Sequence, residues 1–398
     1  MASIRYLYLL ILAALLGGCA TTGMVFDDRA VTLDKPAAEL ADHQLLDVWI
    51  ETFDPGKLPV GEESAQGLSM DIREAEARYI PIHLADTMEK TGYWGSVRVV
   101  PSVTEGGEVL VKGRILSSDG GVLRLQISAR DATGREWFSR AYGLTLDARA
   151  YGAQAWNTEV FQGLYNLIAN DLARHRNGLS TADVLQIRRV AEMRFARDLA
   201  PDAFARYLQI DNDSEYSIVG LPAANDPMYQ RILAIRERDF MLIDTLNGHF
   251  DNFFLEMQAP YAEWRSARSE EAEALRAVER SAWQRKALGI AAIAGAIALG
   301  AASDSDTRAR TGTLRDVMVL GGLYAVKTGF DKDEETTIHR AAIEELDASF
   351  SAEAQPLVVD IEGETHELTG SAETQYAKWR SLLRQVYAAE TGLVQAAD

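Results

Sequence analysis

The chain has 398 residues, of which 47% are hydrophobic and 25% charged, so it is long enough for two or three globular domains. Its 59 acidic residues outnumber 40 basic ones, for a formal net charge of -19. Because such a charge is repelled by phosphate backbones, the composition argues against nucleic-acid binding, and we expect no nucleic-acid partner.

The N-terminal segment ends on the only cysteine of the chain. Residues 6–16 form an apolar run that follows Arg5, and residues 16–19 read LGGC. A charged start, about 7–15 apolar residues and small residues before a cleavage site are the layout of a secretory signal. The run is well short of the roughly 20 residues of a membrane-spanning helix. Ending on cysteine, it resembles the lipobox of bacterial lipoproteins.

In lipoproteins the cysteine is diacylated with fatty acids such as palmitate, the signal is removed before it, and the new amine is acylated. The resemblance implies that residues 1–18 are the signal peptide and that Cys19 is the lipidation site. Residues 19–43 are small and polar, which suits a lipidated tether. Ala20 stands where lipoproteins kept at the inner membrane usually carry Asp. We therefore expect a Gram-negative outer-membrane lipoprotein whose body lies on the periplasmic face.

Residues 44–150 predict a small α/β domain. Strand-like segments, each closed by turn residues, alternate with one helical pattern that starts at Asp71 and ends at Gly92. Pro81 should kink this helix or mark a later start. The expected strands cover residues 45–53, 97–103, 109–116, 122–129 and 136–144. This order predicts a small mixed sheet with a helix packed on one face.

Parts of this domain resemble a known group of envelope lipoproteins. Residues 91–97 (TGYWGSV), 109–115 (VLVKGRI) and 123–134 resemble the periplasmic domain of the curli-secretion channel lipoproteins. They are similar also to the lipoprotein activators of murein synthases and to the N-terminal domain of the Tol-Pal translocation protein. The resemblance covers roughly residues 44–145. An unrelated α+β domain with similar turns is the alternative.

Residues 151–286 predict a helical region. One helix is expected over residues 153–176, and a second begins at a Ser180 or Thr181 cap. The apolar spacing of residues 227–286 indicates a long helix with a coiled-coil-like arm, about 90 Å if continuous. Two ordinary helices divided at Pro260 are the alternative.

Residues 287–330 predict a Gly/Ala-rich apolar helical hairpin. Residues 287–302 carry no charge, and small residues recur every fourth position at Ala292, Ala296 and Gly300. Such spacing permits close helix contact. Sixteen residues give about 24 Å of helix, below the roughly 30 Å hydrocarbon core of a bilayer. Burial in the soluble core, a seam between protomers and a hairpin dipped into the bilayer remain the three alternatives.

Residues 331–398 predict a helix, a β-hairpin around Gly363 and a final helix over residues 373–391. The fold class is therefore α+β. We expect a small mixed sheet with a packed helix in the N-terminal half. A mainly α-helical region with a C-terminal β-hairpin follows it.

No motif indicates catalysis. The six histidines are widely separated, and the chain has neither an H-E-x-x-H pair, nor a Gly-x-Ser-x-Gly elbow, nor a phosphate-binding loop. We therefore expect no enzyme activity, no metal and no cofactor, and Cys19 is the only functional residue that the sequence identifies.

The sequence favours a non-catalytic lipoprotein that acts in envelope assembly, as a scaffold or a secretion accessory. It would attach to the membrane by its lipid, bind other envelope proteins and form a homo-oligomer. A regulator of a peptidoglycan synthase is the first alternative. A hydrolase whose site is assembled from distant residues is the second.

Overall fold

The computed structural model describes residues 25–26, 31–58, 70–101, 105–146, 148–151, 159–302, 359–361, 364–366 and 372–391. The expected signal peptide, Cys19, the second half of the apolar hairpin and the helix expected before the C-terminal hairpin lie outside these residues.

The body is built on one mixed sheet with the strand order β1-β6-β5-β4-β2-β3. Strand β2 runs parallel to both β3 and β4, whereas β4, β5 and β6 form an antiparallel meander. A two-residue strand, β1, pairs in parallel with the outer side of β6. The strands are β1 (Val25–Phe26), β2 (Val48–Glu51), β3 (Val97–Val100), β4 (Val109–Ser118), β5 (Val122–Asp131) and β6 (Glu136–Thr145). The predicted mixed sheet is confirmed.

Helices cover this sheet and continue the chain. They are α3 (Met70–Glu89), α4 (Gln162–Asn177), α5 (Thr181–Leu199), α6 (Pro201–Phe204), α7 (Pro227–Ala302) and α10 (Ala372–Thr391). The described residues also form the 3-10 helices η1 (Asp42–Gln44) before α3, η2 (Ala148–Tyr151) before α4 and η4 (Ala205–Tyr207) after α6. Two small hairpins pair β7 (Leu208–Ile210) with β8 (Tyr216–Ile218), and β9 (Val359–Ile361) with β10 (Glu364–His366).

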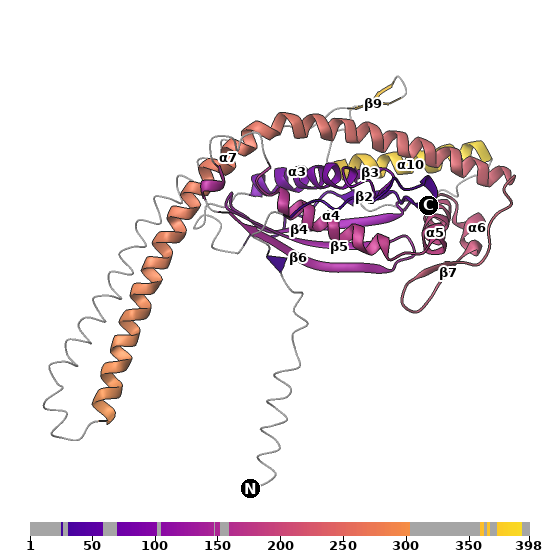
Figure 1. Ribbon diagram of the computed structural model, residues 1–398. Coiled ribbons are helices and arrows are strands. Elements are labelled where there is room, and N and C mark those ends of the chain that lie inside the picture. Colours follow the sequence, from indigo (N-terminus) through magenta and orange to yellow (C-terminus); the bar gives the residue numbers. More distant parts are fainter. Residues whose placement is uncertain are drawn as a thin grey trace, which may run out of the picture.

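Two of these helices run through prolines. Helix α3 begins at Met70, one residue before the expected start at Asp71, and passes through Pro81 without ending. Helix α7 continues through Pro260 and past residue 286, so the expected alternative of two separate helices is wrong. Its 76 residues correspond to about 114 Å. Figure 1 shows that the first part of α7 crosses the body, while the rest extends away from it.

One hydrophobic core joins the sheet to the helices. Its buried side chains come from the strands (Trp49 and Tyr142), from α4 (Tyr165), from α7 (Leu242) and from α10 (Tyr376). The core therefore does not end near residue 150, where the sequence placed a domain boundary. The α/β region and the helices after it share their apolar interior.

Much of the expected tether is docked on the body. The Asn166 side chain donates to the Val31 carbonyl at 2.7 Å, and the Asn170 side chain donates to the Thr32 carbonyl at 2.8 Å. The Asp34 N–H in turn donates to the Asn170 side chain at 2.8 Å. These contacts hold the segment against α4, and only residues before this point are left to act as a tether.

Candidate functional site

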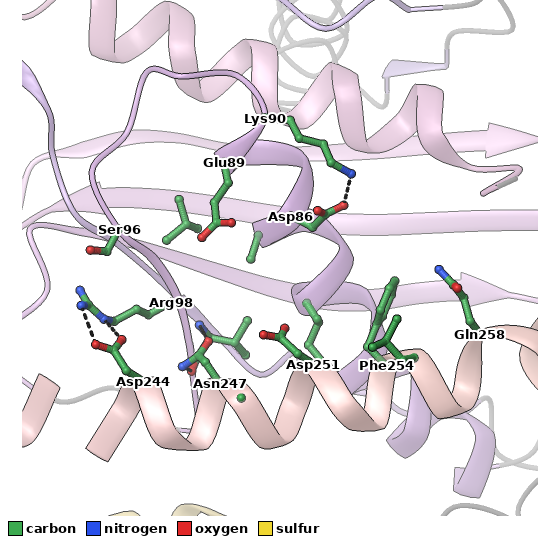
Figure 2. A pocket seen from close by; sticks show the side chains of 16 residues that line it. Asp86, Glu89, Lys90, Ser96, Arg98, Asp244, Asn247, Asp251, Phe254 and Gln258 are labelled. Carbon is green, nitrogen blue, oxygen red and sulfur yellow. Dashed lines mark hydrogen bonds and ion pairs between the residues drawn. The ribbon is translucent and has the colours of Figure 1, made fainter. Parts of the chain in front are cut away.

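A groove of about 750 Å³ lies between α3, β3 and α7. This is a size usual for ligand sites. Figure 2 shows its charged side chains, which come from the last turn of α3, from β3 and from one face of α7. Its polar lining comprises Asp86, Glu89, Lys90, Ser96, Arg98, Asp244, Asn247, Asp251 and Gln258. Apolar side chains, including Ile82 and Phe254, line the rest.

Helix α7 closes the edge of the sheet at this groove. Strand β3 is the last strand on its side, so its outward peptide groups have no neighbouring strand. The Val99 N–H donates to the Asn247 side-chain oxygen at 2.7 Å, and the Asn247 amide donates back to the Val99 carbonyl at 3.0 Å. One side chain of α7 thus replaces the pairing that another strand would provide.

Both cations of the groove are paired with carboxylates. The Arg98 Nε lies 2.5 Å from Asp244 Oδ1, its Nη2 donates to Asp244 Oδ2 at 3.1 Å, and its Nη1 lies 3.6 Å from Asp47 Oδ2. Lys90 Nζ lies 2.5 Å from Asp86 Oδ2. Burial by itself lowers the pKa of Arg98, but its acidic neighbours outweigh this effect and raise it. The charges of Lys90 and Arg98 are therefore already balanced by Asp86 and Asp244, and they do not balance a further carboxylate of the groove.

Two further carboxylates, Glu89 and Asp251, point into the groove from its opposite walls (Figure 2). Within the described part of the chain, neither has a hydrogen bond or an ion pair. Partial burial raises the pKa of both groups, and the negative charge of Asp86 adds to this effect. The groove therefore carries excess negative charge, and it would attract a cationic group.

A second polar cluster lies buried beneath α7 and serves to fasten that helix. Glu76 accepts hydrogen bonds from Ser118 at 2.5 Å and from Tyr261 at 2.7 Å. Arg265 makes two hydrogen bonds to Glu159, at 2.7 and 2.9 Å, with both side chains less than one-tenth exposed. The Ser118 hydroxyl is itself buried against a carboxylate, so this cluster offers no accessible nucleophile.

The β4–β5 turn packs directly on α7 next to this cluster. Gly120 has a φ of +81°, and a Cβ there would lie 2.8 Å from the Arg265 carbonyl oxygen. Only glycine permits both the backbone conformation and the close approach. The Arg265 region is therefore held from two sides, by a buried ion pair and by a turn.

Two of the histidines, His83 and His175, pack against aromatic side chains of the body. His83 is buried, with Nε2 2.9 Å from the Gln162 side-chain oxygen, and it packs against Tyr165. His175 lies near Trp137, and burial lowers its pKa. Among the described residues, no group of three or more His, Cys, Asp or Glu side chains could hold a metal ion.

Cys19, the one site residue that the sequence predicts, lies outside the described residues.

The sequence did not predict the groove. Part of it does have a sequence signal, because Asp244, Asn247 and Asp251 recur at three- and four-residue spacing on one face of α7. Nothing in the sequence connects that face to Asp86 and Glu89, which precede it by more than 150 residues.

The comparisons with known proteins are negative. No family model matches the chain, no curated protein matches it, and no solved structure matches it. Within the described residues, no helix combines the length and the apolar character that crossing a bilayer requires. The resemblance to envelope lipoproteins therefore rests on the sequence motifs alone.

Proposed function

We propose that this protein is an outer-membrane-anchored periplasmic lipoprotein that acts as a non-catalytic scaffold in envelope assembly. Its attachment would be the lipidated Cys19, and its assembly element would be the end of α7. The observation that carries the proposal is the course of α7, which is part of the body at one end and leaves it at the other (Figure 1).

The part of α7 that leaves the body begins after Ser269, the last α7 residue that the structure describes as buried. Arg268 and Ser269 are still buried, whereas Glu273, Ala277 and Arg280 are exposed. We call residues 270–302 the arm, and at 1.5 Å per residue it is about 50 Å long. An arm of this length suits a protein that holds others at a distance from its own body.

The far end of the arm has the composition of a contact surface. Residues 287–302 contain no charged residue, and a helix that is apolar all round requires burial. Ala292, Ala296 and Gly300 recur every four residues of this helix, a spacing that lets two helices approach closely. These features support self-association through the arm, with a second copy of the chain as the partner.

The native mass of the lipidated protein in mild detergent tests this proposal. We expect a defined multimer for the wild type. A variant that carries both Ala292→Leu and Ala296→Leu should lose the multimer, because the larger side chains block close contact while keeping helix propensity. Ala277→Leu is the matched control, since it makes the same change at an exposed arm position.

Two results would contradict the proposal: a monomeric wild type, or a double variant whose mass equals that of the control. The anchor is tested separately. Cys19→Ala should remove the acyl groups from the N-terminal peptide in mass spectrometry and release the protein from the outer-membrane fraction. A peptidoglycan synthase bound to the wild type in stoichiometric amount would favour the regulatory alternative over the scaffold.

A further inference from the structure

We infer that the groove between α3, β3 and α7 binds a protein partner through an extended peptide segment that carries a lysine or arginine beside an apolar side chain. The groove lies on the body and not on the arm, so this contact adds a second interaction surface to the one proposed for self-association. An open place on α7, the division of the walls into an acidic and an apolar part, and the outer edge of β3 support this class of ligand.

The open place on α7 is at Gly248. This residue lies four positions after Asp244 and three before Asp251, so all three line the same face of the helix. Glycine is a poor helix former, yet Gly248 lies in the interior of α7. A Cβ at Gly248 would have no other atom of the described residues within 4 Å. Packing within the body therefore does not require a glycine here, and the missing side chain leaves room for a ligand.

The walls of the groove are divided into an acidic and an apolar part. The lining holds four carboxylates and only two cations, an excess of two negative charges. Glu89 and Asp251, which have no ion pair within the described residues, point into the groove from opposite walls (Figure 2). One turn further along α7, Phe254 and Leu255 provide an apolar surface, and Leu255 is 65% exposed. A cation next to an apolar side chain matches both parts.

The outer edge of β3 favours a peptide over a small amine. Asn247 binds the outward N–H and carbonyl of Val99. Because peptide groups alternate along a strand, those of Val97, two residues earlier, face the same side. Val97 lines the groove, and among the described residues its outward peptide groups have no partner. The backbone of an extended peptide supplies the donor and the acceptor that are missing there.

The length of the groove sets the size and the pattern of the segment. Asp244 and Gln258 mark its ends on α7, about 21 Å apart at 1.5 Å per residue. An extended chain rises about 3.3 Å per residue, so about six residues fit. Asp251 and Leu255 are about 6 Å apart along the helix, which corresponds to two residues of an extended chain. The cation and the apolar side chain should therefore be two positions apart, on the same side of the peptide.

Calorimetry with designed peptides tests this inference on the full chain in mild detergent. The probe is the blocked hexapeptide Gly-Leu-Ser-Lys-Ser-Leu, which has a leucine two positions to either side of lysine and so suits both chain directions. A second peptide replaces lysine with norleucine, and a third carries N-methyl groups along its backbone. The protein variants are Gly248→Leu and, as the matched control, Ala234→Leu at an exposed α7 position outside the groove.

We expect the wild type to bind the lysine peptide and Gly248→Leu to bind it at least tenfold more weakly, because the new side chain fills the groove. The midpoint of thermal unfolding of Gly248→Leu should equal or exceed that of the wild type, since leucine is the better helix former and its Cβ has free space. Ala234→Leu should change the affinity less than twofold. The norleucine and N-methylated peptides should each bind the wild type at least fivefold more weakly than the lysine peptide.

The inference is overturned if the wild type does not bind the lysine peptide at millimolar concentration, or if Gly248→Leu binds it as tightly as the wild type does. Equal affinity for the norleucine peptide would show that the groove does not select a cation. Equal affinity for the N-methylated peptide would show that it takes an organic amine and not a peptide backbone. A monomeric wild type would contradict assembly through the arm and would leave these results unaffected.

Discussion

At the level of single residues, Glu108 is a buried acid in a position to respond to pH. Its Oε2 accepts the Asp47 N–H at 2.8 Å, and its Oε1 lies 3.5 Å from Arg188 Nε. Burial raises the pKa of Glu108 to about 7, and the charge of Asp47 acts in the same direction. Arg188 and Arg236 oppose this shift without cancelling it. Near neutral pH, this carboxyl therefore changes charge inside the body.

The raised pKa of Glu108 predicts that the fold gains stability from this group as the pH falls. Between its ordinary value of 4.5 and about 7, the folded state binds the proton more tightly than the unfolded state does. The free energy of unfolding should therefore rise by up to about 3 kcal/mol from pH 8 to pH 5. Glu108→Gln should remove this part of the pH dependence in urea unfolding.

The matched control for Glu108→Gln is Asp202→Asn, which neutralises an exposed carboxyl elsewhere on the body. Other acids also titrate in this range. The quantity to compare is therefore the slope of the free energy of unfolding against pH, taken as the difference between each variant and the wild type. If Glu108→Gln keeps the wild-type slope, Glu108 does not cause the pH dependence of stability.

The buried pair of Arg265 and Glu159 predicts strong coupling in a double-mutant cycle. Burial alone would raise the pKa of Glu159, but the Arg265 charge outweighs it and holds the pKa below its ordinary value. Arg265→Met leaves a buried carboxylate without its cation, so it should destabilise the body by about 3–5 kcal/mol. Adding Glu159→Gln should recover part of this loss in chemical unfolding. Additive losses would mean that the two side chains do not stabilise each other.

At the level of elements, Asn247 predicts how strongly the sheet edge depends on α7. Asn247→Leu keeps a side chain of similar size but leaves the N–H and the carbonyl of Val99 without their partner, which should cost about 1–3 kcal/mol in urea unfolding. The exposed edge should also promote aggregation at high protein concentration. Asp244→Asn on the same face is the control, and it should cost at most about 1 kcal/mol. Equal losses would show that α7 does not protect the edge in this way.

The strands were predictable because their signals are local. Residues 122–129 alternate between apolar and polar side chains, and β5 alternates in burial along the same stretch. Turn residues set the ends as well, since Asp119 accepts hydrogen bonds from the Gly121 and Val122 N–H groups before β5 begins. Alternation and turn chemistry act within a few residues, so no knowledge of the tertiary fold was needed.

The expected break at Pro260 is absent because tertiary packing overrides a local rule. Pro260 lacks the N–H that would complete a helical hydrogen bond, which favours a break when α7 is considered alone. Met257 and Tyr261 on either side of it are buried against α3 in the same small core. That packing holds both sides of the proline in one helix. The contacts offset the free energy lost with the missing helical hydrogen bond, and the sequence alone does not reveal them.

The groove could not be derived because its walls meet only in the folded chain. Its α3 side and its α7 side each look like an ordinary solvated face. The docking of residues 31–34 was equally hidden, because it combines hydrogen bonds from Asn166 and Asn170 with the packing of a single apolar residue, Leu33, and no apolar periodicity marks it. Polar contacts between distant segments leave little trace in a single sequence.

At the scale of the whole molecule, the excess negative charge of the groove predicts selective binding of a cationic segment. A short lysine-rich peptide should bind at low ionic strength, and salt should weaken it because exposed charges are screened. Replacing Glu89 with Gln and Asp251 with Asn should reduce the affinity several-fold in calorimetry.

The control for this peptide must carry the same total charge, since the whole chain is acidic. Glu136→Gln with Asp202→Asn removes two exposed carboxylates outside the groove and should leave the affinity nearly unchanged. Equal weakening by both pairs of changes would assign the binding to the overall charge and not to the groove.

The continuity of α7 has a mechanical consequence. The same continuous helix forms one wall of the groove and, beyond its fastening at Arg265, follows the curved course seen in Figure 1 into the arm. A tilt of roughly 5° at the body would displace the far end of a 50 Å lever by about 4 Å. A ligand that separates α7 from α3 at the groove would therefore cause a larger displacement at the far end of the arm. Force applied to the arm would, by the same leverage, widen or narrow the groove.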